Sequence, residues 1–394
     1  MSRTTPLLLL LIACGGSGAG DDTPPVPDAP NDGFDRNAML AHLATHVLLP
    51  MQTELAASAA ALPDAIDAYC DAVEANAIGT TRDAAKAAWI AAVERWQRAD
   101  TLLVGPAAMD NKTLRDRIYG WPLLATCSLD RDTASRFANP ASYDVSTKLV
   151  NARSLAAIEY LIYVDAPDHT CLQTPTGWDA LGVNLPRARC RLAEAIALDV
   201  AVQAATLETA WKADGGDFVG ELSNAGTSGS GITSAQAGAN SISDSMFYAD
   251  KMIKDMKLGE TSGVTINVCG TVGEPCLREV EHPFSDRATF AIRANLAALR
   301  EGFTGTAAVD GPGFDDFLIG VGHPEVAQSM TADLDAAIAA AAALPDSFLT
   351  ALASDYAKVV AAHASVKRIT ADLKTQFLTL LNLEIPDDVA TDND

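Results

Sequence analysis

One carboxylate stands in the middle of an apolar stretch, and it is the first candidate for chemistry. Residues 151–163 read NARSLAAIEYLIY, and Glu159 is the only acidic residue among them. An ionised carboxylate that is buried alone costs several kcal/mol, so it needs a cation, a metal or a proton as a partner. The rest of the sequence should therefore supply a partner for Glu159.

A second acidic residue, Asp100, lies on an apolar helix face. Within residues 81–103, five residues spaced by four, three, four and three positions fall on a single side of a helix. They are Trp89, Val93, Trp96, Asp100 and Leu103. Asp100 is therefore a candidate companion of Glu159. The alternative is that Asp100 points to water near the end of its helix.

Two cationic regions are candidates to neutralise a buried carboxylate. Residues 111–122 contain Arg117 close to Tyr119 and Trp121, and an arginine can hold a carboxylate through two parallel hydrogen bonds. The alternative for Arg117 is an ion pair at the surface. The segment 241–257 carries a cluster of lysines that is unusual in an acidic protein. These are Lys251, Lys254 and Lys257.

Other patterns that hold metals or nucleophiles are weak or absent. His42 and His46 are four residues apart on one predicted helix and could bind a metal with a third ligand, although a solvated helix face is the commoner explanation. His323 and Glu325 are two residues apart, so a helix would direct them to different faces. The sequence has no His-Glu-x-x-His zinc motif, no Gly-x-Ser-x-Gly elbow and no phosphate-binding loop.

The composition favours a large helical protein. The chain has 394 residues, of which 48% are hydrophobic and only 6% aromatic, and alanine is abundant. This is more apolar material than one core usually needs, so two packed units are expected. The formal net charge of −23 argues against binding to nucleic acid or to anionic lipid. Such a charge is typical of a soluble surface or of attraction for cations.

The first residues are typical of an export signal with a lipid-attachment site. Arg3 precedes the apolar run 7–12, which is too short to cross a bilayer. The run ends in Leu-Ile-Ala-Cys-Gly, which resembles the bacterial lipobox, so residues 1–14 are predicted as a signal whose Cys14 carries the lipid anchor to the membrane. An ordinary secretory signal is the alternative. Residues 15–34 are rich in Gly, Pro and Asp and predict a flexible tether.

The remaining cysteines predict disulfide bonds. With Cys14 set aside, an even number is left in a chain that is predicted to be exported. They are Cys70, Cys127, Cys171, Cys190, Cys269 and Cys276. Many pairings are possible, but Cys269 and Cys276 flank the turn-rich segment 270–275 and could close it locally. Metal ligation by these thiols is less favoured because no Cys-x-x-Cys spacing occurs.

Apolar spacing and capping signals predict an all-α fold of two helical bundles. Pro63 is expected to start a new helix, and a helix over 143–164 should carry Glu159. The Gly- and Ser-rich segment 215–239 is predicted as a loop between the bundles. A break is expected near Ser354. The expected units are residues 35–214, residues 215–384 with long irregular loops, and an acidic tail at residues 385–394.

Five segments of the sequence together resemble the imelysin family, in its lipoprotein branch. They are Trp96-x-x-x-Asp100-x-x-x-Val-Gly-Pro106, Arg117-Ile-Tyr-Gly-Trp-Pro122, Ala157-Ile-Glu-Tyr-Leu-Ile-Tyr163, Lys254-Asp-Met-Lys-Leu-Gly259 and Asn295-Leu-x-x-Leu-Arg-x-x-Phe-x-Gly305. The order and spacing of these segments carry the resemblance, which covers roughly residues 37–384.

The resemblance implies two helical bundles with a site near their junction, in a protein of the bacterial cell envelope. Members of the family were first described as metallopeptidases. Others belong to iron-uptake systems, in which a Gly-x-His-x-x-Glu motif is taken to help hold the metal. The matching positions here are Ser154, Ala156 and Glu159, so the Glu is present while the Gly and the His are replaced. Asp100 stands where the family often has a Glu.

Two carboxylates without the imidazole make an oxygen-only donor set. Such a set suits Fe³⁺, Ca²⁺ or Mg²⁺ better than zinc. Loss of the motif His also removes the best general base for peptide hydrolysis. The favoured function is a non-catalytic envelope lipoprotein in iron or metal acquisition, which binds a metal, a metal chelate or an iron-transport partner near Glu159 and Asp100. The residues expected around these two metal ligands are Arg117, Tyr119, Trp121 and Lys257.

Two alternatives stay open at this point. One is a metallopeptidase of the imelysin type. The other is a family member without a metal, in which Glu159 pairs with Arg117 or with a lysine such as Lys257. That protein would have a structural or ligand-binding role.

Overall fold

The described part of the chain folds into helices and connecting turns. The computed structural model describes residues 32–270 and 272–386, and no strand occurs among them. The prediction of an all-α fold is confirmed. None of the helices in these ranges combines the length and the apolar character that a membrane span requires. The predicted lipid site at Cys14, most of the predicted tether and most of the acidic tail lie outside the described residues.

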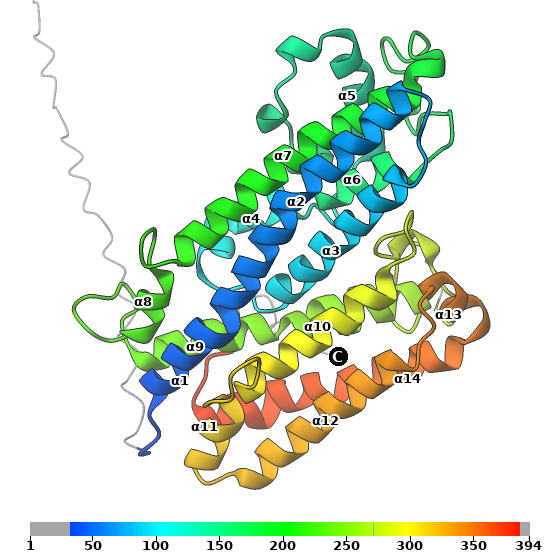
Figure 1. The fold of residues 1–394 in the computed structure, drawn as a ribbon. Coiled ribbons are helices and arrows are strands. Elements are labelled where there is room, and N and C mark those ends of the chain that lie inside the picture. The colour runs from blue at the N-terminus through cyan, green and yellow to red at the C-terminus, as the bar shows by residue number, and fades with distance from the viewer. Residues whose placement is uncertain (1–31, 271, 387–394) are drawn as a thin grey trace, which may run out of the picture.

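Three long helices lie side by side in the N-terminal half (Figure 1). α2 (Leu49–Glu74) packs along α7 (Leu185–Trp211) and along α3 (Thr81–Thr101). The chain enters α2 from α1 (Arg36–His42) through the π-helix η1 (Leu43–Leu48). The shorter elements of this half are η2 (Gly105–Ala107), α4 (Met109–Ile118), α5 (Thr126–Ala138), η3 (Pro140–Ser142), η4 (Val145–Thr147), η5 (Val150–Ala152), α6 (Leu155–Tyr163) and η6 (Gly182–Asn184).

A second group of helices forms the C-terminal half and lies below the first group in Figure 1. α14 (Tyr356–Asp372) packs on α12 (Pro324–Ala342) and on the π-helix η7 (Ala249–Glu260), and α12 also packs on α10 (Ala288–Thr304). The other elements are α8 (Phe218–Ser223), α9 (Ala235–Met246), η8 (Leu277–Glu279), α11 (Phe314–Gly320), α13 (Phe348–Ser354), η9 (Leu373–Phe377) and α15 (Leu378–Leu381).

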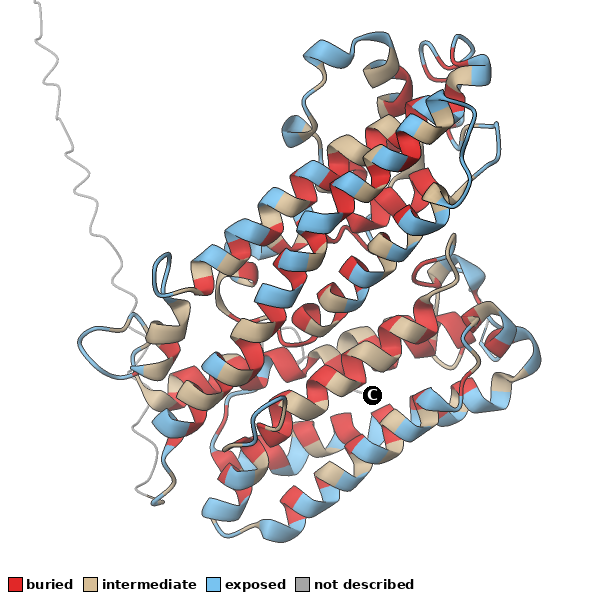
Figure 2. Ribbon diagram, in the orientation of Figure 1, coloured by how far each residue is buried: buried red, intermediate tan, exposed pale blue. Residues whose placement is uncertain are grey.

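The two halves meet where α3 packs on α10. Figure 2 shows that the buried residues of both halves lie mainly on the helix faces turned toward neighbouring helices. One continuous cluster of buried apolar residues runs through both halves. The junction is therefore closed by helix packing, and polar side chains placed there are withdrawn from water.

Three predicted helix boundaries are wrong. Pro63 does not start a helix, because α2 runs through it and packing against neighbouring helices offsets the lost hydrogen bond. The helix that carries Glu159 begins only at Leu155, after two separate 3₁₀ turns. Segment 215–239 is not wholly a loop, because α8 and the start of α9 lie within it. The break predicted near Ser354 is confirmed.

The predicted disulfides are confirmed. The pairs are Cys70–Cys190, Cys127–Cys171 and Cys269–Cys276. The first ties α2 to α7 within the N-terminal half, the second ties α5 to the loop after α6, and the third closes its own loop. The local pairing that the sequence suggested is thus present, and the two long-range pairs fix the end of the molecule that carries α5 and α6.

Asp315, in the first turn of α11, makes stability depend on pH. Burial and the neighbouring charge of Asp316 raise the pKa of Asp315 from 3.8 to about 6. The folded chain therefore binds this proton more tightly than the unfolded chain, and stability falls as the pH rises from about 4 to about 6. We expect Asp315→Asn to raise the melting temperature at pH 7.5 and to leave it nearly unchanged at pH 4. An equal gain at both pH values in thermal unfolding would contradict this assignment.

Candidate functional site

Glu159 is enclosed at the junction of the two halves and has protein partners on both oxygens. Only 1% of the residue is exposed. Its Oε1 accepts hydrogen bonds from the backbone N–H of Phe284 at 3.2 Å and from the N–H and hydroxyl of Ser285, both at 2.8 Å. Its Oε2 lies 3.2 Å from Nδ1 of His282. The partners that the buried charge requires are therefore supplied by the loop at residues 282–285, in the C-terminal half.

α6 holds Glu159 in place through its N-terminal cap. The Ser154 hydroxyl accepts a hydrogen bond from the backbone N–H of Ala157 at 3.4 Å, which starts the helix. Gly120 lies directly against this cap, and a side chain there would come within 2.9 Å of the Ser154 hydroxyl. Ala156, at the position of the family's histidine, is buried and offers no side-chain donor. The imidazole comes instead from His282.

His282 connects Glu159 to a second buried acid, Glu281. The Tyr119 hydroxyl donates to Oε1 of Glu281 at 2.6 Å and lies 3.1 Å from Nε2 of His282. Both ring nitrogens of His282 therefore lie within hydrogen-bond distance of a buried partner, Nδ1 of Glu159 and Nε2 of the Tyr119 hydroxyl. A continuous hydrogen-bonded chain therefore runs from Glu159 through His282 and Tyr119 to Glu281.

Lys257 neutralises Glu281 from the other side. Its Nζ lies 3.0 Å from Oε2 of Glu281 and donates to Oε1 of Gln97 at 2.8 Å and to Oδ1 of Asn295 at 2.7 Å. Three acceptors match the three protons of an ammonium group. We call the connected set the junction cluster, and every member is at most 1% exposed. It consists of Gln97, Tyr119, Glu159, Lys257, Glu281, His282 and Asn295.

The charges in the junction cluster perturb one another. Burial, reinforced by the charge of Glu281, raises the pKa of Tyr119 well above its ordinary value. Burial also works to raise the pKa of Glu281, but Lys257 and His282 outweigh it, so this pKa is lowered. Burial lowers the pKa of Lys257 against the attraction of Glu281. Since three acceptors surround Lys257, we assign an ionised Lys257–Glu281 pair beside a neutral Tyr119.

Asp100 forms its own ion pair next to the junction cluster. Nε and Nη2 of Arg115 lie 3.0 and 3.1 Å from its two carboxylate oxygens, and the Tyr248 hydroxyl donates to Oδ2 at 3.2 Å. Asp100 is 1% exposed, so its predicted place on the buried face is confirmed. The prediction that Arg117 is the counter-ion is wrong. Arg117 is exposed on α4, and Arg115, two residues earlier, takes that role.

The other residues expected around the site are present in it. Tyr119 and Lys257 belong to the junction cluster. The backbone carbonyl of Trp121 accepts a hydrogen bond from Nη1 of Arg115 at 3.0 Å, and the indole ring lies 5.7 Å from Nζ of Lys257. Trp121 therefore connects the Asp100–Arg115 pair to the cluster. Through these two contacts of Trp121, the Asp100–Arg115 pair and the Lys257–Glu281 pair lie next to each other.

As they lie here, the two predicted metal ligands do not fit a shared metal site. Both oxygens of Asp100 are held by Arg115, and both oxygens of Glu159 have hydrogen-bond partners. Among the residues that the structure describes, no group of three or more His, Cys, Asp or Glu side chains is arranged to hold a metal ion. A bare cation would have to displace these donors. Binding of a hard cation by Asp100 and Glu159 therefore remains a prediction.

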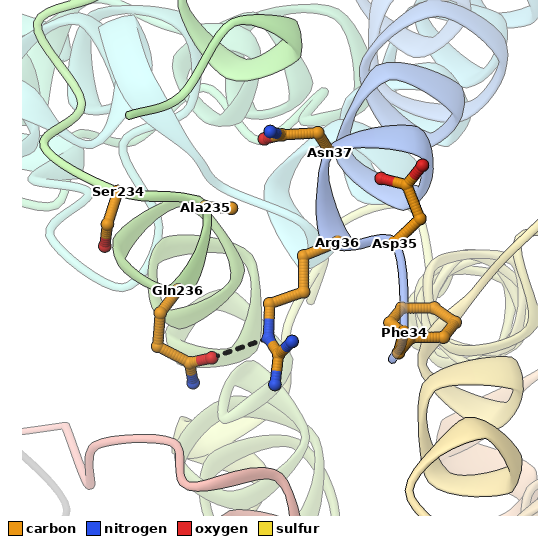
Figure 3. Close-up of a pocket in the computed structure, with 7 residues that line it drawn as sticks. All are labelled: Phe34, Asp35, Arg36, Asn37, Ser234, Ala235 and Gln236. Carbon is orange, nitrogen blue, oxygen red and sulfur yellow. Dashed lines mark hydrogen bonds between the residues drawn. The ribbon is translucent and has the colours of Figure 1, made fainter. Parts of the chain in front are cut away.

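A separate hollow lies beside the start of α1, and its one arginine is already held by protein partners (Figure 3). It lies between the first residues of α1 and of α9. Nε of Arg36 donates to Oε1 of Gln236 at 2.8 Å, as Figure 3 shows. Both terminal nitrogens of Arg36 donate to Asp32. The Gln236 amide donates in turn to the backbone carbonyls of residues 381 and 382. These contacts fasten the N-terminal end of the fold to its C-terminal end.

All five sequence segments that resemble the imelysin family contribute to the junction. In chain order they supply Gln97 with Asp100, Tyr119, Glu159, Lys257 and Asn295. Sequence reasoning gave no role to Gln97 or Asn295, and it missed Arg115, Glu281 and His282. The last two lie in an irregular segment that reads Val-Glu-His-Pro, and no spacing there marks a site. The signal that was available for Arg115 is its position four residues before Tyr119, one helical turn away.

Comparisons with known proteins agree with the fold and identify the family. The family model of imelysin, peptidase family M75, matches residues 48–376. The fold is similar to an imelysin-like protein from Psychrobacter arcticum 273-4, with 18% identity, a TM-score of 0.67 and coverage of 89% of this chain and 96% of that one. It is also similar to a "putative iron-regulated protein A precursor" from Parabacteroides distasonis ATCC 8503, with 15% identity, a TM-score of 0.67 and coverage of 88% and 95%. No match was found among curated proteins.

Proposed function

This chain belongs to the imelysin family, and we propose that it is a non-catalytic lipoprotein of the bacterial cell envelope that binds an iron chelate for iron acquisition. The lipid anchor would be Cys14, and partner proteins of an iron-transport system would receive the iron. The junction between the two bundles is the proposed place of binding, and the junction cluster gives it a fixed shape.

One observation carries the choice of a chelate over a bare cation. Every acid at the junction already has a protein donor: Asp100 has Arg115, Glu281 has Lys257, and Glu159 has His282 and Ser285. A bare cation binds through vacant carboxylate oxygens, whereas a chelate brings its own ligands to the metal. The link to iron is supported by the name of the Parabacteroides distasonis protein, a "putative iron-regulated protein A precursor".

Calorimetric titration of the purified chain tests the proposal. We expect ferric citrate to bind, and we expect anaerobic Fe²⁺, as the bare-cation probe, to show no binding that depends on Glu159. Glu159→Gln keeps the size of the side chain and removes its charge, so it is the variant to compare. Fe²⁺ binding that is lost in Glu159→Gln would favour a bare metal at this site. Failure of ferric citrate to bind would contradict the iron-chelate function.

The runner-up function is a metallopeptidase, and the description of the matching family model favours it. A peptidase needs a metal or nucleophile that substrate can reach and a base beside it. Glu159, the acid of the family motif, is only 1% exposed, and Ala156 stands in place of the motif histidine. We therefore expect no chelator-sensitive cleavage of an unfolded protein substrate. Cleavage that stops with chelator and returns with added metal would establish the peptidase instead.

A further inference from the structure

The π-helix η7 is unusual in its length. π-helices are rare and mostly appear as single turns inside α-helices, frequently at functional sites. η7 has 12 residues, Ala249–Glu260, which is well over one turn. Because helical segments normally adopt the α-helix, contacts with the rest of the protein must stabilise the wider winding here. The side chains on η7 indicate which contacts these are and what the winding achieves.

Two side chains, Lys257 on η7 and Tyr248 directly before it, reach the same face of α3. The Tyr248 hydroxyl donates to Oδ2 of Asp100 at 3.2 Å. Nζ of Lys257 donates to Oε1 of Gln97 at 2.8 Å. Gln97 and Asp100 are three positions apart on α3, so they lie on one side of that helix. Tyr248 and Lys257 therefore point in a common direction, and Nζ of Lys257 lies 5.4 Å from the ring centre of Tyr248.

The wider winding explains this common direction. Tyr248 and Lys257 are nine positions apart in the sequence. With about 3.6 residues per turn, an α-helix would place them about two and a half turns apart, on opposite sides. A π-helix closes its hydrogen bonds one residue further along the chain, so about nine residues complete two turns. The winding of η7 is therefore what directs both Tyr248 and Lys257 toward the junction.

Asp250 carries a buried ion-pair network that the junction cluster does not use. Its carboxylate oxygens lie 2.8 Å from Nζ of Lys254 and 2.9 Å from Nζ of Lys374. Burial works to raise the pKa of Asp250, but the two lysines outweigh it, so this pKa is lowered and the fully buried carboxylate is ionised. Lys374 belongs to η9, the second π-helix that continues α14, and α14 packs on η7. The network therefore ties η7 to the neighbouring helix.

The two ion pairs of Asp250 differ in what they fix. Asp250 and Lys254 are four positions apart on one helix, so helical winding itself brings them together. Lys374 comes from a different helix, so it reaches Asp250 only when η7 has one particular rotation. The Asp250–Lys374 pair is thus the contact that reports and fixes the rotation of η7.

We propose that Asp250 and Lys374 are positioning residues of the junction cluster. Their ion pair holds η7 in its π-helical winding, and this winding directs Tyr248 and Lys257 to α3. Loss of the pair lets η7 rewind toward an α-helix, which turns Lys257 away from Glu281. This inference concerns the shape of the junction and does not depend on the ligand that binds there.

Hydrogen exchange followed by mass spectrometry tests this role in the full chain and in Lys374→Met. Only 17% of the Lys374 side chain is exposed, but its charged end is all that the substitution removes. We expect exchange to become about tenfold faster or more in residues 249–260 and in residues 281–285, whose backbone amides include two donors to Glu159. Lys374→Arg keeps the charge and should exchange like the unmodified chain.

Lys358→Met is the matched control for this measurement. Lys358 lies on α14, and its pair with Asp355 is largely exposed, so both segments should exchange as in the unmodified chain. In Lys374→Met, faster exchange that is confined to η7 and η9 would show that the pair only supports its own helices, and it would overturn the proposal. Equal acceleration in α7, in the other half, would indicate a general loss of stability and would overturn it as well.

A double-variant cycle gives a second test by urea unfolding of Lys374→Met, Lys257→Met and the combined variant. Lys374 pairs with Asp250 and Lys257 pairs with Glu281, so independent sites would give losses of stability that add. We expect the combined loss to be clearly smaller than the sum, because Lys257 has already left Glu281 once η7 rewinds. Additive losses would contradict a link through η7.

Discussion

Replacement of Lys257 by methionine is expected to destabilise the protein by about 3–5 kcal/mol, as is typical when one partner of a buried ion pair is removed. Methionine has a similar length but no charge, so Glu281 would keep its charge in a site that is at most 1% exposed. Oδ1 of Asn295 would lose the donor that Lys257 supplies, and Oε1 of Gln97 would keep only the donor from the Asn295 amide at 3.0 Å. The measurement is urea unfolding followed by circular dichroism.

Lys358→Met is the matched control for this experiment. Lys358 pairs with Asp355 at 2.9 Å, but the two side chains are 50% and 35% exposed. Exposed pairs contribute about 0–1 kcal/mol, so this substitution should be nearly silent. Equal losses in the two variants would show that the Lys257–Glu281 pair is not buried in the way described.

A double variant isolates the charge as the cause. In Lys257→Met/Glu281→Gln the buried carboxylate is also removed, while the glutamine carbonyl can still accept from Tyr119 and Gln97. We expect this variant to lose clearly less stability than Lys257→Met alone. A double variant that is less stable than the single variant would mean that shape or packing, rather than charge, explains the loss.

Much of the fold could be predicted from the sequence because its signals are local. The spacing of Trp89, Trp96 and Asp100 reports one helix face, and the structure places all three on the buried side of α3. The ends of the helices were predicted less accurately than their buried faces. Pro63 is normally a breaker, but α2 is packed by neighbours along its length and continues through it. Here tertiary packing outweighs the tendency of proline to end a helix.

The polar contents of the site could be predicted only in part. Glu159 stands out because a charged residue is unexpected in an apolar segment. Lys257 stands out because a cluster of lysines is unexpected in an acidic chain. His282 does not stand out, because it lies in an irregular segment and reaches Glu159 across 123 positions of the sequence. No helical or strand period relates residues in a loop to a distant helix. The imidazole that the motif lacks at Ala156 was therefore present in the chain but could not be assigned.

The same limit explains the choice of the wrong arginine. Arg115 and Arg117 are two residues apart, so they point to different sides of α4. The sequence indicates that one of them can reach a buried acid, but the rotation of α4 about its axis, which is set by its packing on α7, decides which one. Arg115 is buried and Arg117 is exposed. This orientation depends on tertiary packing, which cannot be predicted from a single sequence.

The two arginines also provide the second prediction with a large expected effect. Arg115→Met should destabilise the protein by about 3–5 kcal/mol, because it leaves Asp100 charged, 1% exposed and without its two-pronged partner. Arg117→Met, on the same helix, should change stability by no more than about 0.5 kcal/mol. Both are measured by urea unfolding under the same conditions. Similar losses in the two variants would contradict the assignment of Arg115 as the counter-ion.

This pair of variants also decides between an ion pair and a metal at Asp100. If Arg115 is the natural partner, bare Fe²⁺ does not change the stability of the unmodified chain through Asp100, since no carboxylate oxygen at Asp100 is vacant. A ligand that binds only the folded state raises its stability by mass action, so a metal held by Asp100 would show itself as a dependence on metal concentration. Two results together would instead indicate that Asp100 is a metal ligand. Arg115→Met would be as stable as the unmodified chain, and a chelator would destabilise the unmodified chain. We expect the opposite, because the guanidinium already occupies both oxygens.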